Sequence, residues 1–177
     1  MQLFVVRTFL IKQFCMHKAQ YSFTFKVYHA IDELNNEDAM LLKKAREITN
    51  NAYAPYSHFC VGAIAKLKSG AFVCGANQEN ASFPAGICAE RVLLSSVSSQ
   101  YPKETIEAVA ISYDNTNGMS DKPVSPCGIC RQTLLEYEER QQQPIRLILG
   151  GMEGEVYVIP KASLLMPLSF GGKNLTR

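Results

Sequence analysis

Three cysteines and one glutamate are spaced as the ligands and the base of a catalytic zinc site. The sequence contains Cys88-Ala-Glu90 and, further along, Pro126-Cys127-Gly-Ile-Cys130. Zinc favours thiolate ligands in a tetrahedral arrangement, and a Cys-x-x-Cys pair that opens a helix can present two sulfurs to one ion. Cys88 supplies a third sulfur. Three protein ligands leave the fourth position to water, which is typical of catalytic rather than structural zinc sites.

Glu90 provides the acid–base group in this interpretation. In the first turn of a helix, Cys88 and Glu90 can both reach an ion that lies beyond the helix N-terminus, although residues two apart in mid-helix point to opposite sides. A carboxylate placed there can take a proton from metal-bound water and pass it on. This joint pattern is a variant of the signature of zinc-dependent base deaminases. A lone Cys-x-x-Cys would equally suit a redox pair or half of a structural zinc site.

Helical spacing and strand alternation predict the elements that must position these groups. We expect Asn36 to cap the first helix. The predicted helices are 37–52, 88–99, 127–140 and a short one after Pro160. The predicted strands are 22–28, a hairpin of 60–67 with 71–76, a buried strand at 106–112, and an antiparallel pair at 145–149 and 156–159. From the first helix onward, without the strand 22–28 of the N-terminal segment, this order predicts an α/β fold, a three-layer α-β-α sandwich around a five-stranded mixed sheet.

Composition limits the protein to one compact domain that acts on small molecules. The chain has 177 residues, 47% of them apolar and 19% charged, and a formal charge of +2. That charge is too small and too scattered to predict a nucleic-acid partner. The apolar stretch 3–14 is interrupted by Arg7 and Lys12, so it makes a poor secretion signal, and no membrane span is evident. We expect residues 1–35 to be an N-terminal extension, 36–177 to be the catalytic domain, and the location to be cytoplasmic.

Between residue 52 and about residue 170, the sequence resembles the cytidine deaminase family, specifically the small form that acts on free nucleosides. The motifs that carry the resemblance are Ala52-Tyr-Ala-Pro-Tyr-Ser-His-Phe-Cys-Val-Gly-Ala63, Asn77-Gln-Glu-Asn80, Cys88-Ala-Glu-Arg91 and Val124-Ser-Pro-Cys-Gly-Ile-Cys-Arg-Gln132. The resemblance implies hydrolysis of cytidine, and of deoxycytidine, to the uracil nucleoside and ammonia in pyrimidine salvage.

The resemblance also implies a role for each matching residue. One zinc ion per chain would be held by Cys88, Cys127 and Cys130. Glu90 would move protons to N3 of cytosine and then to the departing ammonia. The substrate-binding set would be Phe59, Asn77, Glu79, Ala89 and Phe170. Arg91 would hydrogen-bond the thiolates. Without the resemblance, Phe59 would be read as a core residue, and Asn77 and Glu79 as a polar loop rim.

A homotetramer with shared active sites is a further expectation from the resemblance, because the family places a C-terminal aromatic, here Phe170, in a neighbour's pocket. Two positions depart from the family's pattern. Phe83 stands where a tyrosine is usual, and Pro167-Leu-Ser-Phe170 replaces the common Pro-Gly-Ala-Phe.

Single residues distinguish the cytidine deaminase family from other interpretations. A blasticidin-type deaminase shares the zinc triad but characteristically lacks the glutamate found here as Glu79. RNA adenosine and deoxycytidylate deaminases normally have histidine where Cys88 stands. A non-catalytic, zinc-stabilised binding protein has no need for Glu90. Cys74 is the one alternative fourth ligand, but as a strand residue we expect it to be a small, buried, apolar side chain. His58 is expected at the surface or as a cap.

Overall fold

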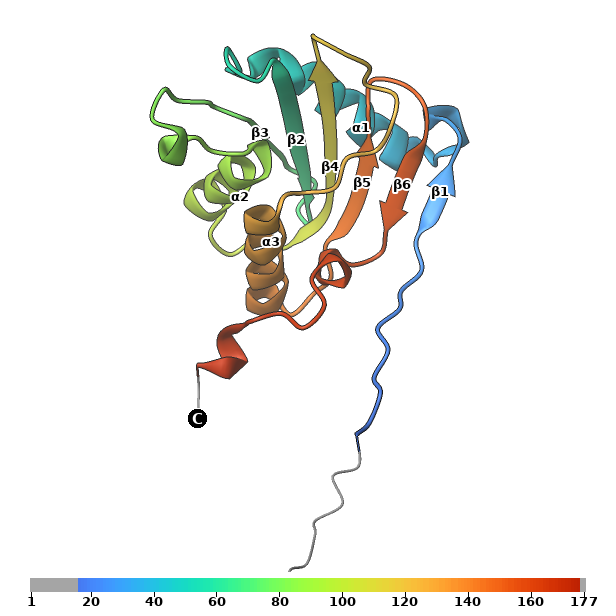
Figure 1. Ribbon diagram of the computed structural model, residues 1–177, viewed down its shortest axis with the longest axis vertical. Helices are drawn as coiled ribbons and strands as arrows, with labels where there is room; N and C mark the ends of the chain where they lie inside the picture. Colours follow the sequence, from blue (N-terminus) through green and yellow to red (C-terminus); the bar gives the residue numbers. More distant parts are fainter. Residues whose placement is uncertain (1–15, 176–177) are drawn as a thin grey trace, which may run out of the picture.

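A mixed sheet of six strands forms the centre of the computed structural model, which describes residues 16–175 (Figure 1). The strand order is β1-β6-β5-β4-β2-β3, and every neighbouring pair is antiparallel except β4 with β5. Helix α1 covers one face of the sheet, and helices α2 and α3 cover the other (Figure 1). The predicted three-layer sandwich is therefore confirmed, with six strands where we expected five.

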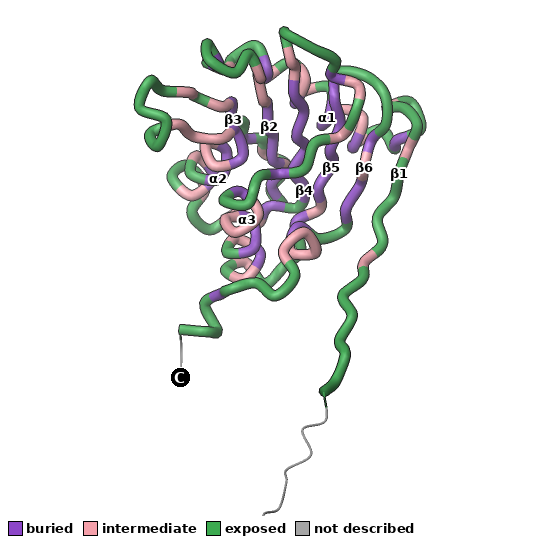
Figure 2. Tube along the Cα trace, viewed as in Figure 1, coloured by how far each residue is buried: buried purple, intermediate pink, exposed green. Residues whose placement is uncertain are grey.

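The two faces of the sheet bury separate hydrophobic cores because side chains alternate along each strand. On β2 (Phe59–Leu67), Ala63 and Ala65 pack toward α2 and α3, while Ile64 packs toward α1. Figure 2 shows the central strands as buried, and the loops and both ends of the described chain as exposed. The buried sheet thus supports the helices and loops that place side chains at its edge.

Helix α1 spans Asn36–Ile48 and continues as a short 3-10 turn over Thr49–Asn51. The side chain of Asn35 accepts the Asp38 N–H at 2.9 Å, so Asn35 is the N-cap and the expectation of Asn36 was wrong. The two adjacent asparagines favour the cap equally by residue type, and only the geometry of the first turn separates them. The buried stripe that the spacing predicted is confirmed at Leu41, Leu42 and Ala45.

Strands β2 and β3 (Phe72–Ala76) form the predicted hairpin, and β4 (Ile106–Asn115) pairs with β2 on its other side. Gly75 allows helix α2 to lie directly on β3. A Cβ added at Gly75 would come within 2.4 Å of the Leu93 nitrogen and 2.5 Å of the Ala89 carbonyl oxygen. Because that approach involves the backbone of the helix, it fixes where the first turn of α2 sits over the sheet.

Helices α2 (Ala89–Gln100) and α3 (Gly128–Gln141) each begin one residue after a cysteine. Cys88 and Cys127 occupy the two N-cap positions, with extended backbone and no side-chain cap bond. The helix starts expected at 88 and 127 are therefore confirmed to within one residue.

Neither these helices nor any other helix in the described range 16–175 is long and apolar enough to cross a membrane.

The last part of the chain supplies β5 (Arg146–Gly150), β6 (Val156–Ile159) and a 3-10 turn, Ala162–Leu165. The antiparallel pairing predicted for β5 and β6 is confirmed. The sixth strand is β1 (Lys26–Tyr28), which adds to β6 at the edge of the sheet. It is shorter than the predicted 22–28, and Phe25 before it packs on Tyr157 with ring centroids 5.0 Å apart.

The proposed division at residue 35 stays a prediction. Its first fifteen residues, including the apolar stretch 3–14, lie outside the described part of the chain. Within that part, β1 is a member of the same sheet as the strands of the catalytic domain, so the extension joins the domain at this edge.

Candidate active site

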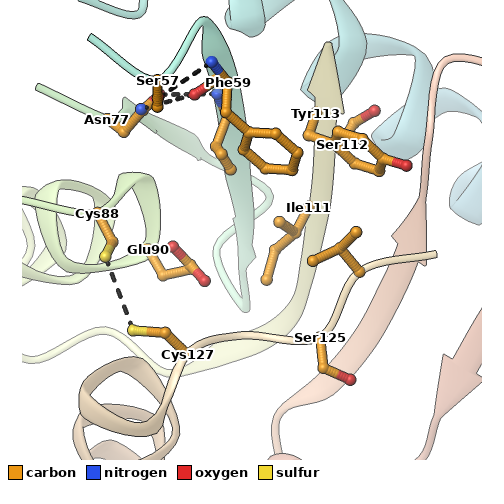
Figure 3. A pocket seen from close by; sticks show the side chains of 12 residues that line it. Ser57, Phe59, Asn77, Cys88, Glu90, Ile111, Ser112, Tyr113, Ser125 and Cys127 are labelled. Atoms are coloured by element: carbon orange, nitrogen blue, oxygen red, sulfur yellow. Dashed lines mark hydrogen bonds between the residues drawn. The ribbon is translucent and has the colours of Figure 1, made fainter. Parts of the chain in front are cut away.

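Three cysteine sulfurs meet between the starts of α2 and α3. The Cys88 and Cys127 sulfurs are 3.7 Å apart, the Cys127 and Cys130 sulfurs are 3.4 Å apart, and all three lie within 4.8 Å of one another. Figure 3 shows Cys88 and Cys127 pointing toward each other from the two helices. The Cys-x-x-Cys spacing across one helical turn brings Cys130 back to the same point.

This donor set fits a zinc ion. An ion with Zn–S bonds of about 2.3 Å in tetrahedral geometry separates its sulfurs by about 3.8 Å, close to the distances observed here. The pKa values of Cys88 and Cys130 reflect how close their sulfurs lie. Hydrogen bonding from Cys130 lowers the pKa of Cys88 to about 6, whereas the interaction with Cys88, together with burial, raises the pKa of Cys130. Three such close sulfurs lose all their protons readily only when a cation offsets their charge.

Glu90 follows Cys88 in the first turn of α2 and lines the same cavity. Its side chain is buried, with only 5% of the residue exposed, and burial raises the pKa of its carboxyl group. In Figure 3 the carboxylate oxygens point into the space between the thiols and β4. A carboxyl group with a raised pKa beside a metal-ligand cluster is suited to accept and return protons.

The cavity beside these groups has a volume of about 410 Å³, within the range typical of small-molecule sites. The structure brings Phe59, Asn77, Cys88, Glu90 and Cys127 together around it. The remaining lining residues were not among those predicted from the sequence; they are Ser57, Val61, Ile111, Ser112, Tyr113, Val124 and Ser125. Of these, Ser57, Val61, Val124 and Ser125 stand inside the motifs quoted above, whereas the three β4 residues carry no motif signal.

Asn77 and Ser57 hold the backbone of Phe59 at the cavity wall. The Asn77 side chain donates to the Phe59 carbonyl oxygen at 2.9 Å and accepts the Val61 N–H at 2.7 Å. The Phe59 N–H donates to the Ser57 hydroxyl oxygen at 3.1 Å (Figure 3). Each group of the Asn77 amide keeps one further hydrogen-bonding position for a ligand.

Glu79 lies just outside the cavity and is tied to its rim. One carboxylate oxygen, Oε2, accepts the Tyr56 N–H at 2.9 Å and the Ser57 N–H at 3.3 Å. Hydrogen bonding from the Ser57 side chain lowers the pKa of the Glu79 carboxyl group, so that group is ionised at neutral pH. Glu79 is therefore held beside the cavity through Ser57, whose hydroxyl oxygen also accepts the Phe59 N–H.

Three other predicted site residues do not line the cavity of the isolated chain. Ala89 is completely buried at the first position of α2, and Phe170 is 59% exposed in the C-terminal tail. Arg91 lowers the pKa of Cys88 through its charge, but among the described residues its guanidinium makes no hydrogen bond to a thiol. Arg131 instead braces this region, because its Nε donates to the Pro126 carbonyl oxygen at 2.7 Å, directly before Cys127.

Cys74 lies outside the sulfur cluster, as expected, but it is exposed rather than buried. Val73 packs into the core beneath α2, so the alternation of β3 turns Cys74 to the opposite face of this edge strand. His58 is exposed, as expected, and adopts φ 58° in the tight turn before β2.

The chain is similar to known deaminases in sequence and in fold. The family model described as the cytidine and deoxycytidylate deaminase zinc-binding region matches residues 35–142. A cytidine deaminase of Halalkalibacterium halodurans is 36% identical over 71% of this chain and 89% of its own length. A blasticidin-S deaminase of Bacillus cereus is 30% identical over 77% of this chain and 94% of its own length. A crystal structure of cytidine deaminase from Burkholderia pseudomallei, 32% identical, aligns with a TM-score of 0.64 over 77% of this chain and all of that one.

Proposed function

The chain belongs to the cytidine and deoxycytidylate deaminase family, and from this premise we propose that it converts cytidine and water to uridine and ammonia. The observation that carries the proposal is the cluster of three thiols beside the buried Glu90, in one cavity with Asn77 and Phe59. Deoxycytidine is the second proposed substrate, in pyrimidine salvage. Formation of uridine from cytidine by the purified protein tests the proposal.

Cys88, Cys127 and Cys130 would hold one zinc ion per chain. When bound, the ion would supply Lewis-acid chemistry, which lowers the pKa of a water molecule so that it can lose a proton and attack the pyrimidine. Glu90 would accept one proton from the attacking water and deliver it to N3, and would then take the second proton from the oxygen newly bound to C4 and give it to the departing amine. The raised pKa of the Glu90 carboxyl group supports both roles, because the group must hold a proton between the two transfers.

The remaining residues bind and orient the nucleoside. Phe59 presents its ring to the pyrimidine, and Asn77 and Glu79 hydrogen-bond the ribose hydroxyl groups. The contacts of Glu79 support its assignment to the ribose. Its Oε2 already accepts from two backbone N–H groups, so its Oε1 is left to accept from a ligand. Arg91 contributes its positive charge to the thiolates rather than a direct hydrogen bond.

We expect Glu79→Ala to lower kcat/KM for cytidine by at least about tenfold while zinc content stays unchanged. A polar group placed to bond a substrate hydroxyl gives large discrimination, because it is left unpaired when that hydroxyl is missing. Steady-state assays on cytidine, free cytosine and blasticidin S measure the change. Unaltered cytidine kinetics in this variant would show that the ribose binds elsewhere. A preference of the wild-type protein for blasticidin S over cytidine would favour blasticidin deamination as the activity.

We further propose a homotetramer in which the C-terminal aromatic of one chain completes the site of another. Phe170 lies outside its own chain's cavity, and large apolar side chains are exposed in the isolated chain, among them Phe83 at 76%, Ile129 at 62% and Leu168 at 103%. Exposed apolar side chains mark protein contacts where they form one contiguous patch. Leu168, which stands where the family's common Pro-Gly-Ala-Phe has glycine, adopts φ 53°, in the left-handed region that favours glycine.

Mixed oligomers test the shared site. Phe170→Ala chains keep Glu90, and Glu90→Gln chains keep Phe170, so co-expression should give more activity than the two variants purified separately and added together. Alone, Phe170→Ala should weaken cytidine binding by about 1–3 kcal/mol, the value of a lost aromatic stack and its burial. Light scattering reports the assembly. A fully active monomer, or co-expressed chains no more active than the sum, would contradict the proposal.

A cytoplasmic location is also proposed, because three zinc-binding thiols must stay reduced, and a reducing compartment keeps them so.

A further inference from the structure

Tyr113 stacks directly on Phe59 and supports it from the side of β4. Strands β2 and β4 pair so that Val61 faces Tyr113 and Phe59 faces Asn115, which makes Phe59 and Tyr113 diagonal neighbours on one face of the sheet. Their ring centroids are 4.6 Å apart and the ring planes differ by only 14°. Such diagonal pairs are within reach of aromatic side chains, and offset stacking is a preferred arrangement of two rings.

Different groups hold the backbone and the ring of Phe59. Ser57 holds its N–H and Asn77 holds its carbonyl oxygen, which fixes the backbone at the start of β2. These two bonds leave the side-chain torsions of Phe59 free. The stacked face of Tyr113, which is only 6% exposed, restricts those torsions by packing.

The side of the Phe59 ring that Tyr113 leaves open is the side nearer to Glu90 and the thiols. In Figure 3, Tyr113 lies on the side of Phe59 farther from Glu90 and the thiols, and both aromatic residues line the cavity. A pyrimidine held between Phe59 and Glu90 therefore contacts a ring whose plane Tyr113 determines. The Tyr113 hydroxyl makes no hydrogen bond within the range 16–175, so the ring and not the hydroxyl is the relevant group.

We propose that Tyr113 is a positioning residue that fixes the plane of Phe59 and, through it, the orientation of the substrate base toward Glu90. The proposal rests on the function proposed above. It assigns a role to a residue that lies outside every quoted motif, at the end of a strand whose alternation alone would class it as core.

Replacing the Tyr113 ring should weaken substrate binding and turnover, and it should act only through Phe59. Tyr113→Leu should lower kcat/KM for cytidine by about five- to tenfold and weaken uridine binding by a similar factor in calorimetry, as loss of one aromatic stack implies. Tyr113→Phe, which keeps the ring, should recover most of the loss. In a Phe59→Leu background, adding Tyr113→Leu should change kcat/KM less than twofold.

A matched control separates positioning from general destabilisation. Tyr137 on α3 is half-buried and outside the cavity, and its hydroxyl donates to the Leu94 carbonyl oxygen at 2.6 Å. Tyr137→Leu should lower the unfolding temperature without changing the affinity for uridine. If Tyr113→Leu gives too little folded protein, Tyr113→Met takes its place in the same comparison.

Three results would overturn the proposal: wild-type kinetics in Tyr113→Leu, an equal loss in Tyr113→Phe, or an undiminished effect when Phe59 is already leucine. Each of these results bears on the proposal only when the wild-type enzyme is active. A zinc-loaded wild type that leaves cytidine unchanged would instead contradict the proposed function.

Discussion

Glu90→Gln protein should fold, bind one zinc ion per chain and be almost inactive, with kcat for cytidine lower by about 10⁴-fold. The amide keeps the size of the side chain but cannot accept and return a proton. Acid–base groups contribute about 10²–10⁴-fold, and one carboxyl group that serves several transfers belongs at the top of that range. Steady-state turnover and metal analysis on the same sample measure both quantities.

The fold of this variant should not suffer. Burial raises the pKa of Glu90 above its ordinary value, so ionising the carboxyl group costs stability, and this cost grows as the pH rises from the ordinary glutamate range through the raised pKa. A neutral amide avoids the cost at neutral pH. The unfolding temperature of metal-free Glu90→Gln should therefore equal or exceed that of the metal-free wild type.

Exposed Glu136 on α3 supplies the matched control, because Glu136→Gln makes the same chemical change outside the cavity. It should keep full activity. Turnover by Glu90→Gln within tenfold of wild type would remove Glu90 from the reaction.

Cys127→Ala should abolish zinc binding and, with it, activity. Only two sulfurs remain in the cluster, and a metal site that loses one of three ligands loses most of its affinity. We expect less than about a tenth of an equivalent of zinc per chain and a fall in turnover of more than about 10³-fold, since the Lewis acid is missing. Because zinc binds the folded state, wild-type protein should unfold at a lower temperature after chelation, whereas the variant should not respond.

Cys74→Ala is the matched control, since Cys74 is a free thiol on β3 that lies outside the cluster. It should keep zinc, turnover and the response to chelator. A Cys127→Ala protein with a full equivalent of zinc would show that the ligand assignment is wrong.

The sequence predicts those parts of the site that depend on local spacing. Cys127 and Cys130 are one helical turn apart, and Glu90 follows Cys88 by two positions in a first turn, so the chain alone brings these groups to helix N-termini. Helix and strand positions followed from periodicity for the same reason. The capping residue was misplaced by one position because Asn35 and Asn36 are the same residue type.

What depends on strand register could not be predicted. The stack of Tyr113 on Phe59 requires that β2 and β4 pair in one particular register across more than fifty residues of sequence, and no motif marks it. The bonds from Asn77 to Phe59 and Val61 likewise depend on how the chain after β3 lies against β2. Cys74 was expected to be buried because it is a strand residue of the hairpin, whereas β3 is an edge strand and leaves this side chain exposed.

Removal and return of zinc, followed by cytidine turnover, tests the central claim most directly. Protein stripped of metal by a chelator should convert no cytidine. Activity should return in proportion to added zinc and reach its plateau at one equivalent per chain, with one uridine and one ammonia formed for each cytidine consumed. Full zinc loading without uridine formation, or a plateau that requires a second equivalent, would contradict the account of a single three-thiolate site that deaminates cytidine.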